Sequence, residues 1–106
     1  MCPLKEWFSE FVDLNGGQIQ MRNDISCQIE GIGKVKLLLD NNYALELENI
    51  RYVPELKRNL ISLGELDEKY NIYIHKGLIS LTLGEKRVIS SSKINGIYTV
   101  HAKPVL

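Results

Sequence analysis

Turn-forming residues recur along this sequence roughly every 8–12 positions, which leaves room only for short elements. Asn15–Gly17, Asp40–Asn42 and Asn95-Gly96 combine residues that suit tight turns or a positive φ. Between the turns, apolar and polar side chains alternate, as in Lys34–Asp40 and Tyr43–Tyr52. This period of two is typical of strands with one buried face. The sequence therefore predicts a mainly β fold, a small closed or partly open β-barrel of short antiparallel strands.

Two stretches depart from the strand period. Residues 4–11 follow a proline with apolar groups at helical spacing, which predicts a short N-terminal helix. In the middle of the chain, Val53–Leu66 reads as a strand end, a charged turn and an apolar run. Leu63, Leu66 and Tyr70 then lie at i, i+3 and i+7, which indicates one internal helix near residues 60–70.

The length and charge balance limit the functional classes. A chain of 106 residues is the size of one domain. Thirteen basic and thirteen acidic residues cancel, and a nucleic-acid binder usually carries a basic excess. Nucleic-acid binding remains a third functional class, but the interleaved glutamates favour a solvated face over a nucleic-acid surface. The basic residues in question are Lys34, Lys36, Arg51, Lys57, Arg58, Lys86 and Arg87.

The few cysteines and histidines do not form a recognisable site. Cys2 and Cys27 are too far apart in the sequence to suggest a zinc site, and His75 and His101 do not complete one. No apolar run is long enough for a transmembrane helix, and the N-terminus has no apolar signal region. We expect no metal and no membrane partner, with reduced thiols in an intracellular, cytoplasmic setting.

Two motifs that could carry chemistry have plainer structural interpretations. Gly31-Ile32-Gly33 lacks a third glycine and precedes no helical pattern, so we interpret it as a bulge or bend between strands. No cofactor is expected there. Glu46 and Glu48 share one strand face, and we expect that face to be solvated because an acid–base pair needs a pocket. The change of register near Asn49 predicts a second bulge.

The last third of the chain predicts further hairpins. Ser90–Ser92 is interpreted as a polar link, and Ile97–Val100 as a last strand. Ala102–Leu106 resembles a frayed tail or a linker. The predicted organisation is therefore one domain over residues 1–101 and a tail over residues 102–106.

Six motifs, in order, resemble a known family. They are Met1-Cys2-Pro3, Trp7-Phe8, Met21-Arg22-Asn23-Asp24, Gly31-Ile32-Gly33, Val53-Pro54 with Asn59-Leu60-Ile61-Ser62-Leu63, and Ile94-Asn95-Gly96-Ile97-Tyr98. With them, the chain resembles the β-barrel domain of copia-type LTR-retrotransposon Pol polyproteins, the segment that holds the retroviral-type aspartic protease. Arg22 departs from the glycine of the family's turn.

The resemblance implies a role for two segments. Gly31, Ile32 and Gly33 would open a flap-like hairpin that extends to Tyr52. Leu60, Ile61, Ser62 and Leu63 would form the apolar strand behind the catalytic loop and lead into the helix. In such proteases two subunits bring two aspartates together around a water, so the implied partners are a second copy in a homodimer and the rest of the Pol polyprotein.

The catalytic motif of this family is absent from the sequence. Asp13, Asp24, Asp40 and Asp67 are not followed by Ser-Gly or Thr-Gly, and the family's catalytic loop would lie just before Met1. We therefore expect a truncated, non-catalytic fragment, at most an interaction module, with no catalytic residue of its own. The alternative is an aspartic endopeptidase domain that processes the Gag-Pol polyprotein once the missing Asp-Ser/Thr-Gly loop is supplied.

Overall fold

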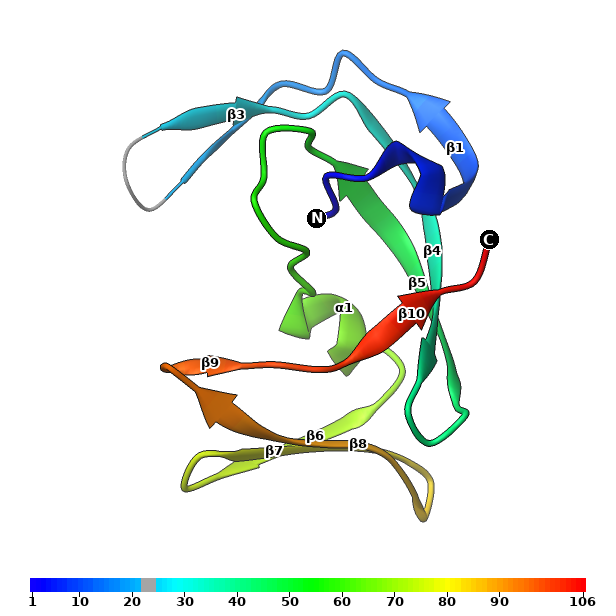
Figure 1. Cartoon of the computed structure of the whole chain (residues 1–106), viewed down its shortest axis with the longest axis vertical. Helices are drawn as coiled ribbons and strands as arrows, with labels where there is room; N and C mark the ends of the chain where they lie inside the picture. Colours follow the sequence, from blue (N-terminus) through cyan, green and yellow to red (C-terminus); the bar gives the residue numbers. More distant parts are fainter. Residues whose placement is uncertain (22–24) are drawn as a thin grey trace.

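A computed structural model describes residues 1–21 and 25–106 of the chain (Figure 1). The described elements are short strands, with one α-helix and one 3-10 turn. In chain order they are η1 (Lys5–Trp7), β1 (Phe8–Asp13), β2 (Gln18–Gln20), β3 (Ser26–Gln28), β4 (Gly31–Leu39), β5 (Ala44–Tyr52), α1 (Leu63–Asp67), β6 (Asn71–His75), β7 (Leu78–Leu83), β8 (Lys86–Ile94), β9 (Ile97–Tyr98) and β10 (Ala102–Pro104).

The first sheet is organised around β4, which is paired along both edges. β5 pairs antiparallel with one edge of β4 through the turn at Asp40–Asn42. The other edge is shared, because β1 pairs with the first half of β4 and β10 with its last three residues. Asn42 adopts a positive φ of 66° in this turn, as an asparagine can. The predicted hairpin is confirmed.

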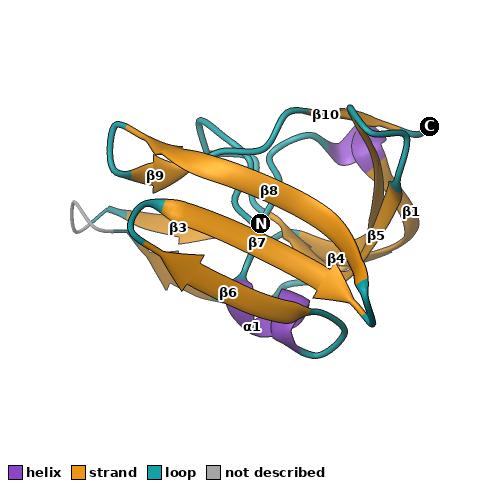
Figure 2. Cartoon of the chain, turned by 90° about the horizontal axis from the view of Figure 1, so that it is seen from below, coloured by secondary structure: helices purple, strands orange, loops and turns teal. Residues whose placement is uncertain are grey.

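The second sheet has the strand order β6-β7-β8-β9, and all its pairs are antiparallel (Figure 2). The turn at Asn95-Gly96 falls where the sequence predicts it, with Gly96 at positive φ, and Gly77 also adopts a positive φ in the turn between β6 and β7. Ser90–Ser92 do not form a link, however, but continue β8 opposite residues 78–80 of β7. Serine is tolerated in this strand because its neighbours Val88 and Ile89 supply the buried contacts.

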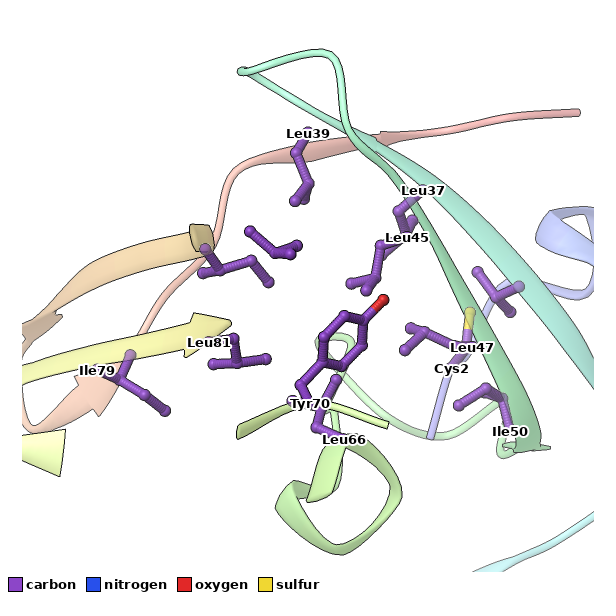
Figure 3. Packing of buried hydrophobic residues seen from close by; sticks show 13 residues of the cluster. Cys2, Leu37, Leu39, Leu45, Leu47, Ile50, Leu66, Tyr70, Ile79 and Leu81 are labelled. Carbon is purple, nitrogen blue, oxygen red and sulfur yellow. The ribbon is translucent and has the colours of Figure 1, made fainter. Parts of the chain in front are cut away.

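One hydrophobic core lies between the two sheets and α1 (Figure 3). The residues that the first sheet contributes come mostly from β4 and β5, where they alternate with exposed or half-buried positions except at residues 48–49 of β5. Leu45, Leu81 and Val88 are the side chains of this core with at most 1% exposure. The helix adds Leu66 and, just after it, Tyr70. The mainly β fold with a partly open barrel and one small internal helix is confirmed.

Among the buried core residues that the structure describes, Tyr70 is the one whose side chain carries a hydroxyl group, and this hydroxyl has a partner. Its oxygen lies 3.0 Å from the hydroxyl oxygen of Tyr43, while the residue is only 4% exposed. Burial raises the pKa of Tyr70 above its ordinary value, and the hydrogen bond with Tyr43 adds to the rise. The folded protein therefore holds this proton more tightly than the unfolded chain does.

This linkage predicts that Tyr70 stabilises the fold fully below about pH 10 and that the contribution is lost as the pH rises further. In urea unfolding, we expect Tyr70→Phe to cost about 1 kcal/mol at neutral pH from the lost hydrogen bond. The gap to the wild type should narrow above about pH 10. The exposed Tyr73 gives the matched control, Tyr73→Phe. A gap for Tyr70→Phe that stays constant through this range would contradict the prediction.

The N-terminal segment differs from the predicted helix. Only Lys5–Trp7 form a 3-10 turn, and Phe8–Asp13 continue as β1 along β4. The apolar spacing of residues 4–11 does not come from a helix face. It arises because Glu10, at φ 49°, forms a bulge that returns Phe11 to the side of Phe8. The helix expected over residues 4–11 is thus reduced to one turn.

The segment expected as a tail is partly ordered into the first sheet. Ala102, Lys103 and Pro104 lie opposite Leu39, Leu38 and Leu37. Val105 adds a backbone hydrogen bond of 2.9 Å to the Lys36 carbonyl. Pro104 is tolerated because β10 lies at the edge of the sheet. The boundary of the domain within a longer polypeptide stays a prediction.

Cys2 and Cys27 are free and buried in different clusters. Cys2 joins the main core, whereas Cys27, which lies on β3, packs with Ile29 and Val53 in a second cluster. Burial raises the pKa of the Cys2 thiol, which disfavours the reactive thiolate. The turn expected at Asn23-Asp24 lies outside the described residues.

Candidate functional site

Gly31-Ile32-Gly33 lies inside β4 and not between strands. The motif is paired with β1 on one edge and with β5 on the other. Glycine is needed because β1 approaches closely: a methyl group at Gly31 would overlap the ring of Phe11, and one at Gly33 would lie 3.0 Å from the carbonyl oxygen of Ser9. The motif is therefore a packing surface for β1. Within residues 1–21 and 25–106, no helix begins directly after the motif, so it has no helix N-terminus that could hold a phosphate.

Three aromatic rings pack together beside these glycines. The ring centroids of Phe8, Phe11 and Tyr52 lie 5.4–6.0 Å apart, all in edge-to-face geometry. They come from β1 and from the end of β5. The flap-like role that the resemblance gives to Gly31–Gly33 stays a prediction. Gly31 lies opposite Tyr52 at the open end of this hairpin, and the tip of the hairpin is the turn at Asp40–Asn42.

Both neighbours of β4 carry a bulge at the same level. On β1 it is centred on Glu10, and on β5 on Asn49, at φ 55°. The bulge predicted near Asn49 is confirmed, whereas the bulge expected within the glycine motif is found on the adjacent strands. Lys34 lies between these two irregularities.

The bulges place two carboxylates around the ammonium group of Lys34. Its Nζ lies 2.8 Å from Oε2 of Glu10 and 3.6 Å from Oε1 of Glu48. The hydrogen bond and charge of Glu10, followed by the charge of Glu48, raise the pKa of Lys34. These side chains are 47–70% exposed. Each charge is thus solvated as well as paired.

A second ion pair continues this row along the hairpin. Nζ of Lys36 lies 3.7 Å from Oε1 of Glu46, whose side chain is 66% exposed. The expectation that Glu46 and Glu48 form a solvated face is confirmed, since both side chains are 66% exposed. Glu48 lines an open pocket beside Lys34 and Glu10, in which its carboxylate stays in contact with solvent. Sequence reasoning missed the partners of these glutamates. A hairpin centred on Asn41 places residue 36 opposite residue 46 and residue 34 near residue 48. The register of the hairpin could therefore have indicated these ion pairs.

The Leu60–Leu63 segment meets the N-terminus of the chain. Met1 and Leu60 exchange both backbone hydrogen bonds, of 2.7 and 2.9 Å. Toward the end of β5, the Cys2 amide donates to the Arg51 carbonyl, and the Cys2 carbonyl accepts from the Val53 amide. Met1-Cys2 therefore lies as an extended segment between the end of β5 and Leu60. Burial lowers the pKa of the α-amino group there.

The rest of that segment packs against the core and leads into α1, without a side-chain hydrogen bond from Ser62 to cap the helix. Ile61 contacts the main core, and Ser62 stands at the N-cap of α1 in an extended conformation. Leu63 is the first residue of α1 and is 46% exposed. The structure thus joins Leu60 to Met1 and packs Ile61 against the main core, but it leaves Leu63 at the surface.

The described aspartates lie apart from one another and at the surface. Asp13 ends β1, Asp40 begins the turn between β4 and β5, and Asp67 ends α1. All three are exposed, and Asp24 lies outside the described residues. Among residues 1–21 and 25–106, no group of three histidine, cysteine or acidic side chains could hold a metal ion. Within one chain, these aspartates do not form the paired, partly buried carboxylates that activate a water.

An open groove of about 240 Å³ lies where the turn of the first sheet meets β8. Asn41 closes one side, since its Nδ2 donates to the Val88 carbonyl at 2.9 Å. Ser91 donates to the Thr99 carbonyl, and these two residues and His101 line the groove. The contact between Asn41 and Val88 spans 47 residues, so no local pattern could have indicated it.

In the described part of the chain, no helix is both long and apolar enough to cross a membrane.

Comparison with known proteins gives two matches. The family model described as "Pol polyprotein, beta-barrel domain" matches residues 1–71. The "Retrovirus-related Pol polyprotein from transposon TNT 1-94" of Nicotiana tabacum is 28% identical over 102 residues. These residues are 95% of this chain but 8% of that polyprotein, so the chain spans a small part of the relative's length. No solved structure matches the chain significantly.

Proposed function

Because the chain belongs to the family of Pol polyprotein beta-barrel domains, we propose that it is a non-catalytic module of a copia-type retrotransposon Pol polyprotein. In this role the domain supplies a folded surface and no peptide-bond chemistry. Its similarity to the Pol polyprotein of a tobacco transposon over nearly its whole length supports this assignment.

The observation that supports the non-catalytic role is the sequence context and the exposure of the aspartates. No aspartate in the sequence precedes Ser-Gly or Thr-Gly, and the described ones are exposed and separate. A water-activating dyad needs two carboxylates that share a proton in a screened site. The charge cluster around Lys34 is exposed, and the lysine is paired with two glutamates, so neither carboxylate is buried or shares a proton with the other.

The alternative is an aspartic endopeptidase domain that processes a Gag-Pol polyprotein when an Asp-Ser/Thr-Gly loop is supplied from outside this sequence. The position of Met1-Cys2 is compatible with this alternative. Its backbone bonds place an extended segment between β5 and Leu60, where a preceding strand would enter the barrel. In that case Leu60–Leu63 would lie behind the added loop.

A comparison of two proteins separates the candidates. One protein is the printed chain, and the other is a chimera with an Asp-Ser-Gly segment added before Met1. Each is incubated with peptides from a random digest of denatured proteins, and cleavage of the peptides is followed by mass spectrometry. We expect no cleavage by the printed chain. Cleavage by the chimera that disappears when its aspartate becomes asparagine would establish the endopeptidase alternative for the extended domain. Cleavage by the printed chain itself would overturn the non-catalytic role.

The partners proposed for this module are the rest of the Pol polyprotein and, as in retroviral-type proteases, a second copy of the domain. An intracellular, cytoplasmic location would follow from that role. The two buried free thiols, Cys2 and Cys27, suit a reducing compartment.

A further inference from the structure

The β6 strand forms an open edge of the second sheet (Figure 2). In the described part of the chain its backbone pairs only with β7. Asn71, Tyr73, Ile74 and His75 are all exposed. An edge strand of this kind presents a row of unpaired amide and carbonyl groups to solvent.

Both faces of this edge carry exposed apolar side chains. Tyr73 is 61% exposed on the outer face, and Ile74 is 51% exposed on the face that leads to the core. The strand, Asn-Ile-Tyr-Ile-His, contains no proline and no Lys, Arg, Asp or Glu. These are the residues with which monomeric proteins usually block edge pairing.

The other long edges are protected by such residues. β1 carries Glu10 and Asp13 as well as a bulge, and β5 carries Glu46, Glu48 and Arg51. β8 pairs with β9 only at Lys93 and Ile94, and the rest of that edge carries the charged residues Lys86 and Arg87. The other edge strands, β2, β3, β9 and β10, have two or three residues each. β6 is therefore the described edge that is best suited to pairing with another strand.

The sequence of β6 is complementary to itself in the antiparallel direction. A two-fold axis at Tyr73 would place Tyr73 opposite its own copy, Ile72 opposite Ile74, and Asn71 opposite His75. The half-exposed Ile74 would then contact Ile72 of the second chain, which removes apolar surface from water on both sides.

The charges that flank β6 match this arrangement. Asp67–Lys69, before the strand, hold two acidic groups and one basic group, a net −1, and Lys76 follows the strand with +1. Antiparallel pairing brings the negative start of one copy to the positive end of the other. The whole chain has zero net charge, so two copies do not repel each other.

We propose that β6 is a self-association edge, through which two copies of this domain form one continuous eight-stranded sheet by antiparallel β6–β6 pairing. The proposal gives the second copy named under the proposed function a specific surface. It does not depend on whether the domain is catalytic.

Sedimentation equilibrium of the full chain over roughly 1–500 µM tests the pairing, since a small interface binds in this range. We expect a monomer–dimer equilibrium in the wild type. Tyr73→Lys and Ile74→Lys should each weaken it by about tenfold or more, because a lysine on the edge opposes pairing. Val12→Lys is the matched control. Val12 is 57% exposed on β1, and its replacement should leave the dimer unchanged.

A cysteine variant checks the register. Because Tyr73 faces its own copy, Tyr73→Cys should form a disulfide-linked dimer on mild oxidation, while Val12→Cys should not. The native cysteines are buried and do not compete. If the wild-type chain stays monomeric over the whole concentration range, both the role of the β6 edge and the homodimer are overturned. If the protein still dimerises with both lysine substitutions, or if Tyr73→Cys forms no disulfide-linked dimer, the proposed role of the β6 edge is overturned but the homodimer is not.

Discussion

Replacing Leu45 by alanine is expected to lower the free energy of unfolding by about 2–5 kcal/mol. Leu45 has 0% exposure. It lies on β5 opposite Leu37 and in the core that both sheets share. The truncated side chain would leave a cavity between the sheets that rigid β4–β5 pairing cannot close. The cost therefore combines lost burial with lost packing.

The measurement is urea unfolding followed by the fluorescence of Trp7, which packs against the same core. The midpoint should fall while the slope stays constant. The control is Leu63→Ala. Leu63 is 46% exposed on α1, where alanine is a good helix former, and the change should stay within about 0.5 kcal/mol. Equal effects of the two variants would show that the sheets do not share the core described above.

Gly31→Ala is expected to destabilise the fold by about 1–3 kcal/mol, the range for overpacking. The added methyl group would overlap the Phe11 ring and lie 3.0 Å from the Val12 carbonyl oxygen. Phe11 cannot turn away freely, because it packs edge-to-face against Phe8 and Tyr52. The φ of Gly31 is not positive, so the cost is steric and not conformational.

Two further variants isolate this cause. Gly64→Ala should be neutral or stabilise by up to about 1 kcal/mol, because Gly64 lies in α1 and meets only the Ser62 hydroxyl, at 3.5 Å. Phe11→Ala removes the ring that causes the overlap. The double variant should then be more stable than the sum of the two single changes predicts, by roughly 0.5–3 kcal/mol. Strict additivity would mean that Gly31 is required for another reason.

Local patterns predicted much of this fold correctly. The alternation in β4 and β5, the asparagine turn between them and the bulge at Asn49 all follow from side-chain period and turn chemistry. The prediction of an N-terminal helix failed because a bulge gives the apolar residues of a strand the spacing of a helix face. Glu10 breaks the alternation of β1, so Phe8 and Phe11 have the spacing of a helix face although they lie in a strand.

Contacts between distant segments were beyond sequence reasoning. Ser90–Ser92 appeared too polar for a strand, yet they extend β8 because β7 supplies their backbone partners. Residues 102–104 gained order from the last residues of β4, some 65 positions earlier, as the register shows. Likewise, the solvated glutamates were expected, but the position of Lys34 between two bulges depends on three strands. Such placements depend on tertiary packing.

The central claim is that this domain carries no peptidase activity, either alone or in pairs. The most direct test is a mass-spectrometric cleavage assay with the printed chain at concentrations below and above the midpoint of its self-association. We predict intact substrate peptides at both concentrations, because pairing through β6 brings no aspartate dyad together. Cleavage that appears only at the higher concentration and is lost when one of the aspartates is replaced by asparagine would contradict the account.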